Sequence, residues 1–104
     1  MILTSSETIA GKQIVKTFGL VMGNTVRARH VGKDILAVFK NVVGGEIEEY
    51  TKLLAESRDQ SLDRMKTQAA ALGANAIVAV RFGTSYVMGS AAEILAYGTA
   101  VVVQ

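Results

Sequence analysis

The residues able to bind a soft metal are few in this sequence. It contains no cysteine and a single histidine, His30, which precedes Asp34 by four residues. Soft metals select thiolate and thioether ligands, and zinc takes cysteine, histidine and carboxylate. An imidazole and a carboxylate from His30 and Asp34 could form a metal site if several subunits brought copies of them to a shared axis. The alternative, which the sequence favours, is that His30 is a solvated residue in a loop.

Methionine does not supply the missing ligands. Met65 falls on an apolar helical stripe, and Met22 and Met88 fall in predicted strands. Methionine at such positions usually fills space in a core. We therefore expect no soft-metal site within one chain and no bound cofactor.

Two pairs of carboxylates have a spacing that could hold a hard cation such as Mg²⁺ or Ca²⁺. Glu46 and Glu49 are three residues apart, and Asp59 and Asp63 are four apart. Both spacings place the paired side chains on the same side of a helix. Arg64 follows Asp63 directly, so a charged face in contact with solvent explains the second pair with fewer assumptions.

Arg58 interrupts an apolar stripe at a point where a helix should bury surface. A buried guanidinium needs a carboxylate or carbonyl partner, for which Glu93 or the backbone of a neighbouring chain are the candidates. One interpretation is an anion or ligand site at a subunit boundary. The favoured interpretation is an ion pair at an interface that fixes how subunits meet.

The sequence gives little support to nucleic-acid binding or catalysis. Arg27, Arg29 and Lys33 form a locally basic segment that could contact phosphates. No aromatic residue is interleaved for base stacking, and the net charge is only +2, so a solvated strand end is favoured. No nucleotide-binding glycine motif and no serine in a nucleophile context is present. We therefore expect neither a nucleic-acid partner nor an enzyme.

Hydrophobic periodicity predicts one strand followed by two helices. Residues 13–27 alternate as a long strand, in which Gly19 and Gly23 indicate a bulge or bend. A turn at Gly23-Asn24, splitting the segment into a hairpin, is the alternative. A short helix is predicted from Asp34 to Gly44-Gly45.

The strongest predicted element is a helix over residues 46–72 that ends at Gly73. Its apolar stripe has a 3.6-residue period and one gap, at Ser57 and Arg58. The stripe comprises Ile47, Tyr50, Leu54, Leu62, Met65, Ala69 and Leu72.

Residues 76–88 and 91–103 predict a β-hairpin around Gly89-Ser90. A two-residue loop would place Phe82 opposite Tyr97 and Tyr86 opposite Glu93. Both faces of this hairpin are apolar, whereas a sheet with one wet face alternates apolar and polar residues. The second face must therefore be covered, most simply by another copy of the chain. A monomer with one helix on each face is the alternative.

Length and composition predict one soluble domain over residues 1–104. Half of the residues are hydrophobic, and the mean hydropathy is +0.33. No apolar run approaches the ~20 residues that a spanning helix needs. No signal peptide is recognisable at the amino end, so we expect a cytoplasmic protein without a membrane partner.

Several segments together resemble the YbjQ-like family of small bacterial and archaeal proteins. They are VGGE at 43–46, LGANAIVAVRF at 72–82 and AYGTAVVV at 96–103, with Tyr50, Arg58 and Met65 on the long helix. The family is uncharacterised, and a heavy-metal-binding label is sometimes attached to it. The resemblance implies an α+β domain of order β-α-α-β-β, with a mostly antiparallel sheet packed by one long and one short helix.

The resemblance also implies assembly into a homo-oligomeric ring, expected to be a pentamer. The predicted function is a ring-forming binding or scaffold module without catalytic chemistry. The alternative is a metal-binding protein whose ligands are shared between subunits.

Overall fold

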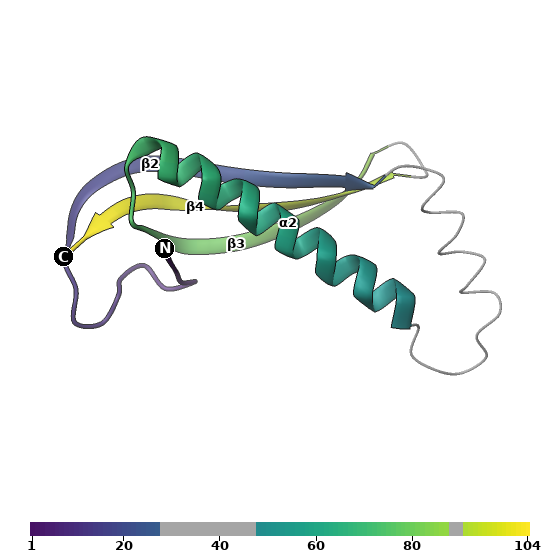
Figure 1. Cartoon of the computed structure of the whole chain (residues 1–104), viewed down its shortest axis with the longest axis horizontal. Helices are drawn as coiled ribbons and strands as arrows, with labels where there is room; N and C mark the ends of the chain where they lie inside the picture. The colour runs from purple at the N-terminus through teal and green to yellow at the C-terminus, as the bar shows by residue number, and fades with distance from the viewer. Residues whose placement is uncertain (28–47, 88–90) are drawn as a thin grey trace.

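The computed structural model describes residues 1–27, 48–87 and 91–104, which form one helix and a four-stranded sheet. Along the chain the elements are β1 (Ile2–Leu3), β2 (Ile14–Arg27), α2 (Glu48–Leu72), β3 (Ala76–Val87) and β4 (Ala91–Val103). The long helix runs diagonally along one face of the sheet (Figure 1). The domain is α+β, as the sequence predicts, and the short helix expected from Asp34 to Gly44 lies outside the described residues.

The sheet has the order β1-β3-β4-β2 and is mixed. β4 pairs antiparallel with both β2 and β3, whereas β1 pairs parallel with β3 through Ile2 opposite Ala76 and Leu3 opposite Ile77. The sequence analysis did not identify β1, because two residues are too short to show an alternating pattern.

β2 is one continuous strand, so the alternative of a hairpin at Gly23-Asn24 is wrong. Gly23 pairs with Ala96 and Asn24 with Leu95 in an unbroken register. Of the two glycines predicted to mark a bulge or bend, Gly19 does so, since the register shifts there and φ is +107°, whereas the register is unbroken at Gly23. Glycine adopts this conformation readily, whereas other residues are strained in it. The glycine at position 19 therefore determines where the bulge forms.

The hairpin of β3 and β4 forms at the predicted place, but the predicted register is wrong. Phe82 pairs with Ala96 and Tyr86 with Ala92, whereas Tyr97 lies opposite Arg81. Because the last pair joins Val87 to Ala91, three residues separate the strands instead of the two assumed.

A β-bulge in β3 adds a further shift between Val78 and Arg81. Ala79 has a positive φ of 54° at this point, which is uncommon outside glycine. A slip of one residue moves a side chain to the opposite face of a sheet. Phe82 therefore shares the face of Ala96, which is the face that α2 covers.

The carboxyl end of α2 is closed by Gly73, as predicted. Gly73 has φ +94° and donates its N–H to the carbonyl of Ala70 at 3.0 Å, while Ala74 donates to Ala69 at 3.1 Å. These two bonds form a Schellman motif, which satisfies carbonyls that the helix leaves without partners.

The helix and the sheet enclose the main apolar core. Its buried members come from β2, α2, β3 and β4 and the turn after the helix: Val21, Met65, Ala69, Ala74, Ile77, Ala96 and Ala100. A second, smaller cluster lies on the opposite face of the sheet, where residues Ala76, Val78, Val101 and Val103 pack against Ile9 of the amino-terminal segment. The amino-terminal segment therefore covers one end of the second face.

Candidate functional site

The remainder of the second sheet face is open and carries apolar side chains on β2 and β4. On β2 the side chains of Leu20, Met22 and Val26 are 63%, 45% and 51% exposed. The adjacent strand β4 brings Tyr97 opposite Met22 and Leu95 opposite Asn24, both of them part-exposed. The prediction that both faces of the hairpin are apolar is confirmed only in part. Leu95 and Tyr97 of β4 lie on this face, whereas β3 contributes Arg81, Gly83 and Ser85 opposite Tyr97, Leu95 and Glu93.

One carboxylate stands on this open face. Glu93 of β4 accepts a hydrogen bond from Asn24 Nδ2 of β2 at 3.0 Å and another from Ser85 Oγ of β3 at 3.3 Å. Each carboxylate oxygen therefore has one donor, and three strands contribute to the cluster. A carboxylate held in this way is a polar anchor within an apolar surface.

Arg58, the predicted partner of Glu93, lies elsewhere. It belongs to α2, on the other side of the sheet, and its side chain is exposed. Within the part of the chain that the structure describes, no ion pair or hydrogen bond joins Arg58 to another residue. The expectation that its own chain withdraws Arg58 from water is wrong, because Ser57 occupies the buried position beside it, with 1% of its surface exposed. A partner for Arg58 on another subunit stays a prediction.

The sequence analysis missed a buried polar cluster between α2 and β2. Thr25 donates to the carbonyl of Ser57 at 3.1 Å and lies 3.0 Å from Ser61 Oγ. Ser61 Oγ also lies within hydrogen-bond distance of the carbonyls of Ser57 and Ile94. The sequence indicates this cluster only through its spacing. Ser57 and Ser61 are four residues apart, and Met65 and Ala69 continue the same spacing along the helix.

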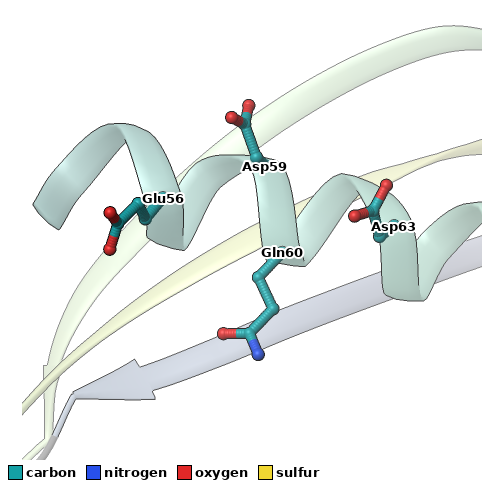
Figure 2. Close-up of a pocket in the computed structure, with 4 residues that line it drawn as sticks. All are labelled: Glu56, Asp59, Gln60 and Asp63. Carbon is teal, nitrogen blue, oxygen red and sulfur yellow. The ribbon is translucent and has the colours of Figure 1, made fainter. Parts of the chain in front are cut away.

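The outer face of α2 carries an open surface depression lined by acidic residues. It is bordered by Glu56, Asp59, Gln60 and Asp63, and the carboxylate of Glu56 points away from those of Asp59 and Asp63 (Figure 2). Asp63 forms an ion pair with Lys66 at 3.4 Å. The geometry is that of a charged face in contact with solvent, and the described residues contain no group of three or more histidine, cysteine or acidic side chains placed to hold a metal.

The predicted ligands His30 and Asp34, and the basic residues Arg29 and Lys33, lie outside the described residues. The carboxylate pair Glu46 and Glu49 is likewise not described in its side chains. Among the described helices, none is long and apolar enough to cross a membrane.

A long helix packed along a four-stranded mixed sheet defines a small α+β domain, and solved structures contain a similar one. A protein of unknown function from Pediococcus pentosaceus ATCC 25745 superimposes with a TM-score of 0.65, over 100% of this chain and 98% of that one. The two sequences are 18% identical, so the likeness extends to the fold alone.

Sequence comparison shows the family. The family model described as "Putative heavy-metal-binding" matches residues 1–104, and the chain belongs to this family, the YbjQ-like or UPF0145 proteins. UPF0145 protein DET1617 of Dehalococcoides mccartyi is 58% identical over 104 residues, covering the whole of both chains. A UPF0145 protein of Archaeoglobus fulgidus is 57% identical over 101 residues, covering 97% of this chain and 94% of the relative.

Proposed function

We propose that this chain is the subunit of a closed homo-oligomeric ring that serves as a binding or scaffold module without catalytic chemistry. The observation that carries the proposal is the open apolar face formed by Leu20, Met22 and Val26 beside Leu95 and Tyr97. A contiguous exposed apolar surface on a small domain marks an interaction site. Another copy of the chain is the partner that needs no further assumption.

A ring is favoured over a two-fold pair because exposed apolar residues lie on two different surfaces. Leu20 and Met22 belong to the sheet face away from α2. Phe82, 46% exposed, lies on the helix side of the sheet, and Leu54 of α2 itself is 40% exposed. Contact between two different surfaces is heterologous and produces a ring when the rotation closes. The family resemblance supports five subunits.

Light scattering on the purified protein at micromolar concentration tests this assembly. We expect a single closed species larger than the monomer, and Leu20→Glu to shift it toward smaller species, since a carboxylate would be desolvated in the interface. The matched control is Thr67→Glu, which adds the same charge at an exposed position of α2. A monomeric wild type at this concentration would overturn the proposal.

Metal binding is the second candidate function, because the family model that matches residues 1–104 carries the description "Putative heavy-metal-binding". The described residues do not fit a heavy-metal site, since they provide no cluster of ligands and the sequence has no cysteine. The candidates are His30 and Asp34, shared between subunits. Elemental analysis of tag-free protein distinguishes the two candidate functions. We expect no stoichiometric Zn, Cu or Cd. One metal ion per chain that is lost in His30→Ala would establish metal binding instead.

A further inference from the structure

β2 is an outer strand of the described sheet, yet part of its outer edge is already occupied. Met22 donates its backbone N–H to Oε1 of Gln68 at 2.7 Å, and the carbonyl of Asn24 accepts from Nη1 of Arg64 at 2.5 Å. Met22 and Asn24 are two residues apart, so their backbone groups point to the same edge of the strand. Two side chains of α2 therefore take the positions that a neighbouring strand would use.

The spacing of the two elements makes this arrangement possible. Four residues along a helix advance ~6 Å, and two residues along a strand advance ~6.8 Å. Gln68 and Arg64, four apart on α2, thus match Met22 and Asn24 with the helix running antiparallel to the strand.

Gly23 brings the helix within reach of the edge. A Cβ at this position would collide with the backbone of Ser61 and Met65 and with Cβ of Arg64. Only a strand residue without a side chain allows α2 to lie this close to β2. The glycine and the two long polar side chains act together.

We propose that the outer edge of β2 is a masked strand-addition surface, which Gln68 and Arg64 hold closed. An unpaired edge is a template for pairing with another chain, and proteins protect such edges. Here the protection consists of two hydrogen bonds, one with each of two exposed side chains. Both bonds can break and uncover the strand edge without disturbing the core.

The partner that fits the uncovered edge is the same edge of a second copy. Two copies of β2 that meet antiparallel around Met22 and Asn24 present identical residues to each other, as a two-fold contact requires. The paired strands would also continue the open apolar face of Leu20, Met22 and Val26 from one sheet into the next. This contact is distinct from the proposed ring and does not depend on it.

Amide hydrogen exchange tests whether the mask is in place. In Gln68→Ala we expect the exchange of the Met22 amide to rise about fivefold, the factor of one neutral hydrogen bond, while amides that bond to β4 keep their rates. Gln68→Glu keeps an acceptor and should preserve protection, and Gln60→Ala, an exposed glutamine on the same helix, should change nothing. An unchanged Met22 rate in Gln68→Ala would overturn the proposal.

A second experiment tests whether Gln68 and Arg64 prevent two copies of the chain from associating through β2. In sedimentation velocity, Arg64→Ala/Gln68→Ala should add larger species whose fraction rises with concentration, beyond the wild-type distribution. The control Lys52→Ala/Gln60→Ala removes the same charge and the same amide from exposed positions of α2 and should sediment as wild type. Wild-type sedimentation of the first double variant, with helix content retained by circular dichroism, would overturn the proposal and leave the ring unaffected.

If the first double variant loses its helix content, Gln68→Ala at high protein concentration replaces it. Extra species from this single variant would support the mask, and their absence would contradict it.

Discussion

Thr25 Oγ1 lies 3.0 Å from Ser61 Oγ in the buried layer between β2 and α2. The two hydroxyl groups carry two protons, and the carbonyls of Ser57 and Ile94 lie within reach of them. With Thr25 donating to the carbonyl of Ser57, Ser61 can donate to the carbonyl of Ile94, and both carbonyls then have a side-chain donor without water. Small polar side chains here let the helix approach the sheet closely and fix its position along β2.

Replacement of Ser61 tests the contribution of this cluster. Ser61→Ala leaves the carbonyl of Ile94 without its side-chain donor and removes the hydroxyl beside Thr25. We expect the free energy of unfolding to fall by ~1–3 kcal/mol, the cost of an unsatisfied buried polar group. Urea denaturation followed by circular dichroism measures it.

Thr67→Ala is the matched control for Ser61→Ala. The hydroxyl of Thr67 donates to the carbonyl of Asp63 on the same helix, but in an exposed position. Its loss should change stability by no more than ~0.5 kcal/mol. Equal effects of the two substitutions would show that the buried cluster has no special role.

Gly23 provides a steric test of the contact between helix and strand. In Gly23→Ala the new methyl group meets backbone atoms of α2, which cannot move aside as a flexible side chain would. We expect a loss of ~1–3 kcal/mol or more, measured by the midpoint of urea denaturation.

Gly83→Ala separates this steric effect from the general effect of replacing glycine in a strand. No atom lies within 4 Å of a Cβ built at Gly83, so its replacement should be neutral or slightly stabilising. A neutral Gly23→Ala would mean that α2 does not lie against β2 in solution.

Asn75 completes the sheet with its side chain, a role that its sequence context did not reveal. Its Nδ2 donates to the carbonyl of Val103 at 2.9 Å, and its Oδ1 accepts from the N–H of Val103 at 2.8 Å. Asn75→Ala removes both bonds and should cost ~1–3 kcal/mol at ~0.5–1.5 kcal/mol for each bond.

Asn75→Asp keeps the acceptor and loses the donor, so it should destabilise less than Asn75→Ala. Thermal unfolding of the three proteins gives the order. A stability of Asn75→Ala equal to that of the wild type would contradict the two-bond interpretation, because neither bond would then contribute.

The elements that the sequence predicted well are those with long periodic patterns and glycine ends. The helix over 46–72 was recognisable because apolar residues recur over many turns and Gly73 follows them, and its described part begins at Glu48. The irregularity at Gly19 was recognisable because a glycine interrupts a predicted strand, although the same signal at Gly23 marks no shift of register.

The register of the hairpin was not predictable for a physical reason. A slip of one residue is normally revealed because it exposes apolar side chains, but β4 carries apolar residues on both faces and so does not distinguish the registers. The bulge at Ala79 adds a second slip without a glycine to mark it.

The buried position on α2 was assigned wrongly because the periodicity counted only apolar residues. Ser57 and Ser61 occupy the buried stripe, and their polarity hid them from a hydrophobic count. Arg58 was therefore expected at a point where the helix buries surface, although it is exposed in the chain.

Substitution of Arg58 tests the proposed assembly separately from the stability of the single chain. Since no hydrogen bond or ion pair joins it to a described residue of its own chain, Arg58→Ala should leave the helix content unchanged by circular dichroism. In the proposed ring its partner belongs to another subunit, and removal of one member of such a buried pair costs ~3–5 kcal/mol. Sedimentation velocity should then show a shift toward smaller species.

Arg58→Lys distinguishes the loss of charge from the loss of geometry. An ammonium group keeps the charge but cannot reproduce the planar, bidentate contact of a guanidinium, so assembly should be restored only in part. Lys52→Ala is the control, because it removes one positive charge from an exposed position on the same helix and should leave assembly intact. Wild-type assembly in Arg58→Ala would show that this residue is solvated in the ring as it is in the single chain, and would exclude it from the subunit interface.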